Sequence, residues 1–363
     1  FCPYCCASHT FLLFPVIILY FRRKVQHLTD ARPVIIIKLT GCRHLTFCYF
    51  AAETFAGITI SQKYKNLRGD LMNDTFPVID GHTKLTGLLG SPVSHSISPL
   101  MHNEAFRLLD LNYVYLCFDV PEANLADTVK GLRCMNIAGF NCTMPDKTKI
   151  CELIDDLSDA ARMIGAVNTV VNENGRLVGH NTDGIGYMQA VKEAGHDIIG
   201  KEMTLLGAGG AATAIAVQAA LDGVSTLHIF NRKGRSWERA LKLADTINAN
   251  TSCKAAVSDL ADEASLRQAL EASTILTNAT SLGMAPHADT CPIPDASMLR
   301  PKLIVSDIIY NPKQTRLLQM ASANGCATFN GLYMLLFQGA EAFRLWTGKE
   351  MPIKPIREHY FKG

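Results

Sequence analysis

The sequence predicts an α/β protein in which strands and helices alternate along the chain. Two segments carry this prediction, one beginning near Lys84 and one beginning at Met203. In both segments, short β-rich apolar runs are separated by stretches with helical periodicity. Such alternation is typical of βαβ units and a largely parallel sheet. A chain of 363 residues is long enough for two domains of this kind.

Composition narrows the class of protein. Hydrophobic residues make up 48% of the chain and charged residues 19%, which allows a sizeable core, and the formal net charge is +2. That charge gives no electrostatic case for binding nucleic acid. The sequence holds no zinc-spaced set of histidines and cysteines, no coiled-coil heptads and no solenoid period. The seven cysteines that follow Cys48 are scattered singly, which favours buried, reduced, structural thiols.

The first segment contains recognisable start and turn signals. Ser98-Pro99 is expected to open a helix, with Ser98 at the N-cap and Pro99 at the first helical position. Asn174-Gly175 between two β-rich runs is a strong hairpin signal. The other expected elements are strands Lys84–Gly90, Tyr113–Val120 and Ala138–Thr143, and a helix over Glu122–Cys134.

The second segment opens with a dinucleotide-type turn. A short apolar strand, Met203–Leu206, runs into Gly207-Ala-Gly209-Gly-Ala-Ala212 and then a helix to about Leu221. This is GxGxxA in a strand–turn–helix setting, where glycines let the backbone approach a pyrophosphate at the helix N-terminus. Further strands are expected at Thr226–Phe230, Thr274–Asn278 and Leu303–Ile309. The sequence therefore predicts a Rossmann-type domain.

The end of the strand at Thr226–Phe230 bears on the choice of nucleotide. A carboxylate there would bind the 2′-hydroxyl of NAD, whereas arginine or lysine accommodates the 2′-phosphate of NADP. The chain has Arg232, Lys233 and Arg235 at this place and no acid before Glu238. Guanidinium groups suit phosphate geometry, so this loop favours NADP. The alternative is an ordinary solvated basic loop.

Residues 1–71 do not match the rest and are expected to be a non-native or disordered extension. Met72 starts a conventional N-terminus, and the codons of Arg68-Gly69-Asp70 are compatible with a ribosome-binding sequence, so we interpret the segment as translated upstream DNA. One alternative is a membrane span over Phe1–Phe21 with the basic cluster after it on the inner face. Another is a redox motif at Cys2-Pro-Tyr-Cys5.

Several ordered motifs resemble one known family. In chain order they are GSPVSHSISPLMHNEAF, NCTMPDK, GAVNT, GHNTDGIG, LLGAGGAATA, NATSLGM, DIIYNP and GLYMLLFQGAEAFRLWTG. They stand in the order found in the shikimate dehydrogenase family, which includes a quinate/shikimate branch. The resemblance covers about residues 84–350.

This resemblance implies reversible, NADP-linked reduction of 3-dehydroshikimate to shikimate in aromatic amino acid biosynthesis. It implies an N-terminal α/β substrate domain, residues 84–183 plus 331–363, and a Rossmann-type nucleotide domain, residues 184–330, with the active site in the cleft between them. We expect a cytoplasmic monomer or homodimer that binds shikimate, 3-dehydroshikimate or quinate and neither membrane nor nucleic acid.

Site residues follow from the same resemblance. The catalytic pair falls on Lys147 and Asp183. The substrate-binding positions fall on Ser96, Ser98, Tyr115, Thr143, Asn168, Thr182, Tyr310 and Gln338. The cofactor-binding positions fall on Gly207, Ala208, Gly209, Gly210, Ala211, Asn231, Arg232, Lys233, Thr280, Gly331 and Met334. No metal site is expected.

The residue types fit this chemistry. Hydride transfer to a ketone leaves negative charge on the oxygen, so a proton donor such as Lys147 must lie within hydrogen-bond reach, and Asp183 can orient its ammonium group. Each residue also has a structural alternative. Asp183 is a good N-cap for a helix over Gly184–Ala194, Lys147 reads as a solvent-facing lysine in a first helical turn, and Gln338 as a satisfied core amide. His95 and His102 are interpreted as packing or capping residues.

Two departures from the family pattern leave alternatives open. Cys142 replaces the usual valine, a change of similar volume that we expect to be harmless. Relatives that accept NAD often carry an aspartate where this chain has Gly234, and the threonine usual in NADP-specific members is also absent. NAD use and a quinate/shikimate activity therefore remain alternatives, as does a non-catalytic sensor of the same fold.

Overall fold

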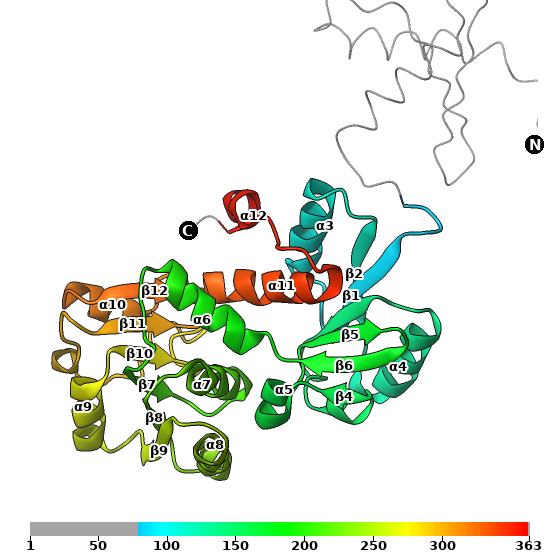
Figure 1. Ribbon diagram of the computed structural model, residues 1–363. Helices are drawn as coiled ribbons and strands as arrows, with labels where there is room; N and C mark the ends of the chain where they lie inside the picture. Colours follow the sequence, from blue (N-terminus) through cyan, green and yellow to red (C-terminus); the bar gives the residue numbers. More distant parts are fainter. Residues whose placement is uncertain (1–78, 362–363) are drawn as a thin grey trace, which may run out of the picture. The chain divides into compact units, whose positions relative to one another are not determined.

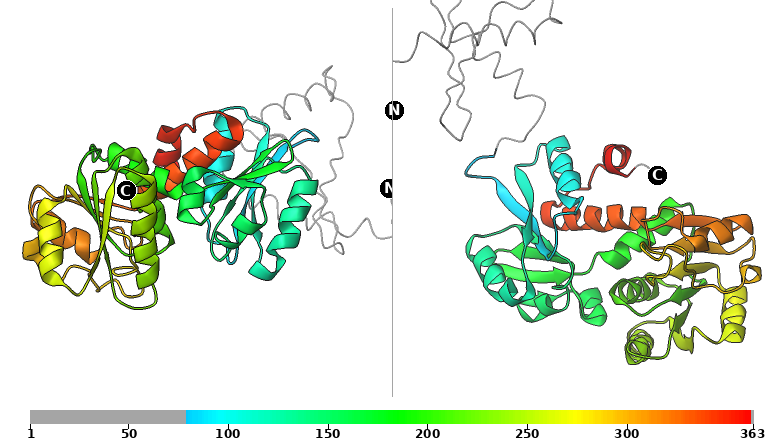
Figure 2. Two further views of the ribbon diagram at one scale, coloured as in Figure 1. Left: turned by 60° about the horizontal axis from the view of Figure 1, so that its bottom comes forward. Right: turned by 180° about the vertical axis from the view of Figure 1, so that it is seen from behind.

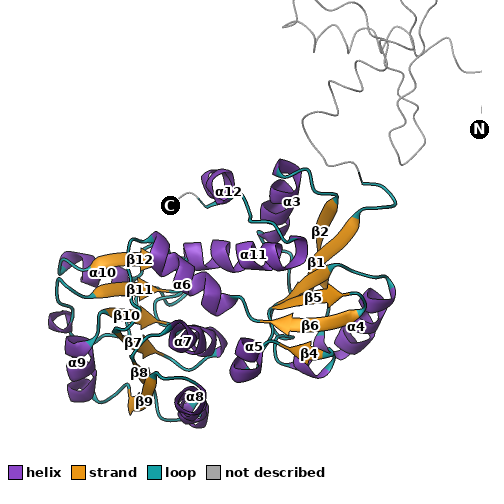
Figure 3. Ribbon diagram, in the orientation of Figure 1, coloured by secondary structure: helices purple, strands orange, loops and turns teal. Residues whose placement is uncertain are grey.

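The computed structural model describes residues 79–361, which form two six-stranded sheets and their covering helices (Figure 1, Figure 3). The expectations for residues 1–71, including the start at Met72, the membrane span and the redox motif, lie outside the described residues. Within the described part of the chain, no helix is both long and apolar enough to cross a membrane. The seven cysteines there form no disulfide; Cys142, Cys253 and Cys326 are buried as expected, whereas Cys134 is exposed.

The first sheet has the strand order β2-β1-β3-β5-β6-β4. Its strands are β1 (Lys84–Gly90), β2 (Tyr113–Asp119), β3 (Gly139–Cys142), β4 (Asp156–Leu157), β5 (Thr169–Glu173) and β6 (Arg176–His180). Its helices are α3 (Ser98–Leu108), α4 (Leu125–Cys134) and α5 (Asp159–Ile164). Strand β1 pairs in parallel with β2 and β3, whereas β5 is antiparallel to β3 and β6, so this sheet is mixed.

The expected hairpin is confirmed by the pairing of β5 with β6. Asn174 and Gly175 form its two-residue loop with φ values of 57° and 95°. Two left-handed residues in succession are the signature of the turn that matches strand twist, and asparagine and glycine tolerate this conformation best.

Two expected helix caps are wrong. Helix α3 has Ile97 at its N-cap, and the Ser98 N–H donates to Ser96 Oγ at 3.2 Å, so the serine two residues earlier takes the polar role. Helix α6 (Asp183–Glu193) has Thr182 at its N-cap, and Asp183 stands in the first turn. An acidic side chain there is favoured by the helix dipole. Its carboxylate is not used for capping and is available to other partners.

The second sheet is wholly parallel, with the strand order β12-β11-β10-β7-β8-β9. Its strands are β7 (Glu202–Leu206), β8 (Thr226–Asn231), β9 (Lys254–Asp259), β10 (Ile275–Asn278), β11 (Ile304–Asp307) and β12 (Ala327–Asn330). Its helices are α7 (Gly210–Asp222), α8 (Trp237–Asn250), α9 (Glu263–Ala272) and α10 (Arg316–Ala323). Read from β9, this is the doubly wound order 3-2-1-4-5-6, which confirms the Rossmann-type domain.

Three strands were not expected from the sequence. Strands β9 and β12 are the two edges of the second sheet, and β4, with two residues, is an edge of the first. Edge strands are short or only half-buried, so they lack the continuous apolar run that marks the central strands.

Helix α6 packs along α11 (Leu332–Thr347), which is followed by α12 (Ile353–Tyr360) (Figure 2). Glycines of α6 permit close packing on two sides: a Cβ at Gly186 would lie 2.5 Å from Gln338 N of α11, and one at Gly184 would lie 2.3 Å from Ala214 O of α7. The other face of α11 completes the core of the first sheet, where Phe343 and Trp346 are buried and Trp346 Nε1 donates to Val170 O at 3.0 Å.

Candidate active site

A cavity of about 660 Å³ lies beyond the carboxyl ends of β1, β3 and β11. Carboxyl ends of parallel strands are where α/β folds place their ligands. Residues of α6 and α11 close the cavity. The sequence-predicted residues that line it are Ser96, Ser98, Thr143, Lys147, Asn168, Asp183, Tyr310, Gly331, Met334 and Gln338.

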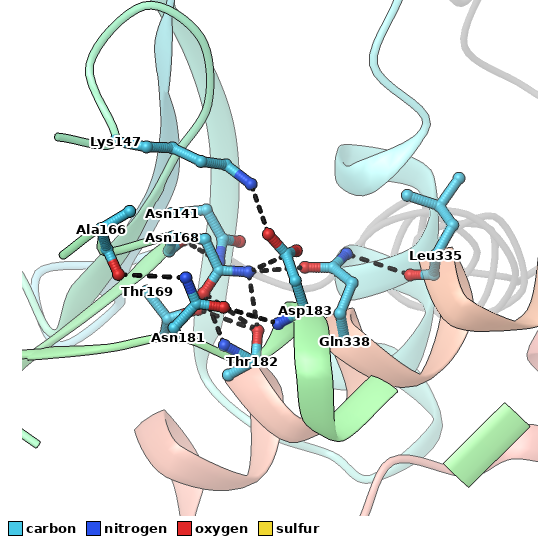
Figure 4. A network of polar contacts seen from close by, with 10 residues as sticks. All are labelled: Asn141, Lys147, Ala166, Asn168, Thr169, Asn181, Thr182, Asp183, Leu335 and Gln338. Atoms are coloured by element: carbon cyan, nitrogen blue, oxygen red, sulfur yellow. Dashed lines mark hydrogen bonds and ion pairs between the residues drawn. The ribbon is translucent and has the colours of Figure 1, made fainter. Parts of the chain in front are cut away.

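Lys147 and Asp183 form an ion pair in this cavity, with Lys147 Nζ 2.6 Å from Asp183 Oδ2 (Figure 4). Their side chains are 27% and 15% exposed. Lys147 lies in the turn after β3 and not in a helix, and its carbonyl accepts from Val167 N–H at 2.8 Å, which ties the turn to the chain before β5. The structure thus places Lys147 inside the cavity and not on an open surface.

The amide of Asn168 holds the other oxygen of Asp183. Asn168 Nδ2 donates to Asp183 Oδ1 at 2.8 Å, and Asn168 Oδ1 accepts from the backbone N–H of Thr182 at 2.8 Å. Because a backbone N–H can only donate, these two contacts decide which end of the amide is oxygen. The Asp183 carboxylate is therefore held at both oxygens, by Lys147 at Oδ2 and by Asn168 at Oδ1.

Gln338 reaches the same cluster from α11. Its Oε1 lies 3.4 Å from Asn168 Nδ2, and its Nε2 donates to Leu335 O at 3.0 Å. The side chain is half-buried and lines the cavity. Its Nε2 is therefore anchored to α11, while its Oε1 lies near Asn168. Close packing at Gly186 is what brings Gln338 this near to Asp183.

Two predicted substrate-binding residues do not line the cavity. Tyr115 and Thr182 are both fully buried. The Tyr115 hydroxyl donates to Asn141 Oδ1 at 2.7 Å, and burial raises the pKa of its phenol well above the usual value, so it stays a donor. Thr182 Oγ1 donates to Asn168 Oδ1 at 3.2 Å. Both side chains support the cavity wall from behind.

Asn141 was not singled out from the sequence, although it opens the motif NCTMPDK. It lines the cavity and is itself buried. Its position in that motif was the available signal.

His102 occupies the interior behind this wall. Its ring stacks on Tyr115 with centroids 4.5 Å apart, and burial lowers the pKa of His102 to about 3. A histidine that stays neutral and fully buried fits the expected packing role. His95, in contrast, is exposed and lines the cavity.

The turn after β7 is shaped for close approach by a ligand. Gly207 has φ +104°, and a Cβ there would meet Ala279 O at 3.0 Å and Thr280 Cγ2 at 3.1 Å. At Gly209 and Gly210, nothing lies within 4 Å of the place a Cβ would take. The N-terminus of α7, with its free N–H groups, faces this open space, which is the arrangement that binds phosphate. Ala208 is buried and Ala211 is half-buried beside it.

The end of β8 presents charge to solvent. Arg232 and Lys233 are exposed, and Lys233 Nζ lies 3.8 Å from Asp259 Oδ2 at the end of β9. The Asn231 side chain is buried and donates to Ser236 Oγ at 3.0 Å, so it shapes the loop that carries Arg232. No carboxylate is present between Arg232 and Glu238.

A second cavity of about 790 Å³ adjoins Gly210 and Ala211 and shares Lys147 and Asp183 with the first. Helix α8 contributes Arg239 and Lys242 to its wall. Sequence reasoning missed both cations. Their three-residue spacing places them on one face of α8, and this spacing was the signal that could have found them.

Gly331 fixes the start of α11 against β11. A Cβ there would lie 1.8 Å from Ile308 O, so no other residue fits this backbone without a shift. This contact sets Met334 and Tyr310 on the wall of the first cavity.

Asp307 organises the loops on the nucleotide side. Its Oδ1 accepts from Asn278 Nδ2 and Ile309 N–H, both at 3.1 Å, and its Oδ2 accepts from Thr315 Oγ1 at 2.7 Å. Asn278 Oδ1 in turn accepts from Thr280 Oγ1 at 2.7 Å. Burial nevertheless dominates and raises the pKa of Asp307 to about 6.

This raised pKa predicts a pH-dependent stability. Folded Asp307 holds its proton up to about pH 6, whereas the unfolded side chain releases it near pH 3.8. Its contribution to stability is therefore present below pH 3.8 and is lost as pH rises to 6, by about 3 kcal/mol for two pKa units. The prediction is tested by measuring the free energy of unfolding in urea from pH 4 to 8. As pH rises, Asp307→Asn should become more stable relative to the wild type by about that amount. A difference that stays constant with pH would contradict this.

The fold and the cavity define a class of protein: a Rossmann-type sheet beside a cavity with a partly buried Lys–Asp pair is the architecture of a nicotinamide-dependent oxidoreductase. The family model for the shikimate dehydrogenase substrate-binding domain matches residues 88–170, and that for the shikimate 5′-dehydrogenase C-terminal domain matches residues 331–359.

Similar proteins agree with this class. "Shikimate dehydrogenase (NADP(+))" of Listeria monocytogenes is 56% identical over 283 residues, covering 78% of this chain and 97% of that protein. "Quinate/shikimate dehydrogenase" of Escherichia coli is 44% identical, covering 76% and 96%. A crystal structure of shikimate 5-dehydrogenase from Listeria monocytogenes in complex with shikimate and NAD is 55% identical with a TM-score of 0.77, covering 79% and 99%. The chain belongs to the shikimate dehydrogenase family.

Proposed function

We propose that this chain catalyses the reversible, NADP-linked reduction of 3-dehydroshikimate to shikimate. The observation that carries the proposal is the Lys147–Asp183 ion pair, enclosed in a cavity lined by neutral hydroxyl and amide groups. A polyhydroxylated acid needs many such neutral partners, and a ketone that accepts hydride needs one proton donor.

Each side of the cavity has its own task in this reaction. When bound, the nicotinamide nucleotide supplies or accepts the hydride at the ring carbon. Lys147 donates a proton to the carbonyl oxygen as it becomes a hydroxyl, and takes that proton back in the reverse direction. Asp183 orients the Lys147 ammonium group. Substrate hydroxyl and carboxylate groups bind to the remaining polar side chains, namely Ser96, Ser98, Thr143, Asn168, Tyr310 and Gln338.

The residues present fit a dinucleotide that carries a 2′-phosphate. The open turn at Gly209 and Gly210 leaves room for a pyrophosphate against the N-terminus of α7. Arg232 and Lys233 offer cations where the 2′-phosphate lies in this fold, and the loop that carries them has no acidic residue before Glu238, although Lys233 also lies 3.8 Å from Asp259 Oδ2. Thr280 lies beside Gly207, and Gly331 and Met334 line the first cavity. In this proposal, residues 184–330 form the nucleotide domain, and residues 84–183 with 331–363 form the substrate domain.

A second candidate is a quinate/shikimate dehydrogenase that uses either nucleotide. The Escherichia coli relative bears that name, and the Listeria structure was solved with NAD. Tyr115, the residue shared with the quinate branch, is buried behind the cavity wall. A non-catalytic sensor is disfavoured because Lys147 and Asp183 are both present and paired.

Cytoplasmic location and a monomeric or homodimeric state belong to this proposal as well. The modest net charge of +2 supports the expectation that nucleic acid is not a ligand. Analytical ultracentrifugation of the purified chain distinguishes the two oligomeric states.

Steady-state kinetics with the four pairings of shikimate or quinate and NADP or NAD test the proposed function. The highest kcat/KM is expected for shikimate with NADP. A higher value for quinate would favour the second candidate, and no turnover with any pairing would favour the sensor.

A further inference from the structure

A buried chain of hydrogen bonds runs from Tyr115 in the first sheet to the Lys147–Asp183 ion pair, and Figure 4 shows the part of it that begins at Asn141. The Tyr115 hydroxyl donates to Asn141 Oδ1 at 2.7 Å. Asn141 Nδ2 donates to Thr169 Oγ1 at 3.0 Å, and Thr169 Oγ1 donates to Asn168 Oδ1 at 3.0 Å. Asn168 Nδ2 donates to Asp183 Oδ1 at 2.8 Å. The first four of these residues are buried.

In each of these four hydrogen bonds, the donor lies on the Tyr115 side and the acceptor on the Asp183 side. The direction is fixed at both ends, because the buried Tyr115 phenol is a donor and the Asp183 carboxylate is paired with Lys147. Asn141 Nδ2 also donates to Asn168 O at 3.0 Å, which fixes the orientation of that amide. Aligned hydrogen bonds of this kind polarise one another and rigidify the groups they join.

Thr169 is the link on which the chain depends. Its hydroxyl has one proton, given to Asn168, and accepts the Asn141 amide; it also lies 3.3 Å from Thr182 Oγ1. It does not line either cavity, so it is not placed to touch the substrate. Thr169 follows Asn168 at the first position of β5, and the antiparallel pairing of β3 with β5 sets it opposite Asn141.

We propose that Thr169 is a positioning residue for the reaction: its hydroxyl, held by Asn141 and Tyr115, orients the Asn168 amide that fixes Asp183 against Lys147. This inference rests on the proposed function. Removing the hydroxyl leaves Asn141 Nδ2 without its side-chain acceptor and removes one donor from Asn168 Oδ1. Thr182 still donates to Asn168 Oδ1 through its backbone N–H and its hydroxyl, and Asn141 Nδ2 still donates to Asn168 O. The Asn168 amide therefore stays bonded but is held less rigidly, which loosens its contact with Asp183.

Kinetics of Thr169→Val test the proposal, since valine keeps the shape and removes the hydroxyl. We expect kcat for shikimate oxidation to fall about 10-fold, the effect of one buried hydrogen bond on the barrier, with KM for NADP unchanged. Thr169→Ser restores the hydroxyl and should return kcat to within about threefold of the wild type.

Thr86→Val is the matched control. Thr86 is a fully buried threonine of β1 in the same sheet, and its hydroxyl donates to Val114 O at 2.9 Å. This hydrogen bond is not part of the series that runs from Tyr115 to Asp183. It should lose stability in urea unfolding and retain kcat. Equal loss of kcat in Thr86→Val and Thr169→Val would show a merely structural effect and overturn the proposal.

Tyr115→Phe provides an independent variant at the head of the chain. It should lower kcat in the same direction, and the double variant Tyr115→Phe/Thr169→Val should lose no more than the worse single variant, because both interrupt one chain. Fully additive losses of kcat in the double variant, or wild-type kcat in Thr169→Val, would overturn this inference and leave the proposed function standing. No turnover by the wild-type chain with any substrate and nucleotide would overturn the proposed function and this inference with it.

Discussion

Lys147→Ala should lower kcat for shikimate oxidation by about 10²–10⁴-fold, the usual contribution of a positioned general acid–base group. The reason is the location of its ammonium group, which lies in the cavity and 2.6 Å from Asp183 Oδ2. KM for shikimate should change much less, because the neutral side chains that line the cavity are still present. Stopped-flow or steady-state absorbance of the reduced nucleotide measures both parameters.

Lys149→Ala is the matched control for this variant. Lys149 is exposed, lies two residues further along, and pairs with Glu152 on the surface. Its replacement should leave kcat within about twofold of the wild type, since surface ion pairs contribute little. A folded Lys147→Ala enzyme with near wild-type kcat would show that the proton donor is another group.

Arg232→Ala should raise KM for NADP by about 10–100-fold, the effect of losing a hydrogen bond to a charged group. KM for NAD should change by less than about threefold, because NAD has no 2′-phosphate for this side chain to bind. The measurement is the ratio of kcat/KM for the two nucleotides at saturating shikimate, in the variant and in the wild type.

Arg176→Ala serves as the control, since Arg176 is an exposed arginine of β6 paired with Asp156. It should leave the nucleotide ratio unchanged. Equal weakening of NADP and NAD in Arg232→Ala would mean that this residue shapes the loop without contacting the 2′-phosphate. A wild-type kcat/KM that is higher with NAD than with NADP would overturn the interpretation of the whole basic loop.

Local signals predicted much of this fold. Strand β1 begins and ends where its apolar run predicts, and the glycine turn, the Asn174-Gly175 hairpin and the central strands β7, β8, β10 and β11 are confirmed to within a few residues. Each is encoded by neighbours in the sequence. Edge strands β9 and β12 were missed because their pairing partners, and not their own side chains, define them.

The capping predictions failed for a related physical reason. Ser98 and Asp183 are good cap residues by type, yet the backbone enters each helix one residue earlier than expected. For Asp183, the ion pair with Lys147 binds the carboxylate from across the fold. No local pattern contains that long-range partner.

The candidate site also has residues that the sequence could identify and residues that only tertiary packing defines. Motif order pointed to the residues that line the cavity, such as Lys147 and Gln338. It could not separate residues at the wall from those behind it, because Tyr115 and Thr182 differ from them only in tertiary packing. Arg239 and Lys242 were missed because their wall is formed when α8 meets α5 and α7.

The packing of α11 determines the order in which the two halves of the chain can fold during synthesis. The sheet of the nucleotide half is built from one continuous stretch, β7 to β12, whereas the core of the first sheet needs Phe343, Trp346 and Ile356 from its final helices. During synthesis, strands β1 to β6 leave the ribosome early and must wait for α11 and α12 to cover them. The later half of the chain can therefore fold before the earlier half is finished, and an unfinished chain exposes the apolar face of the sheet that will carry Lys147.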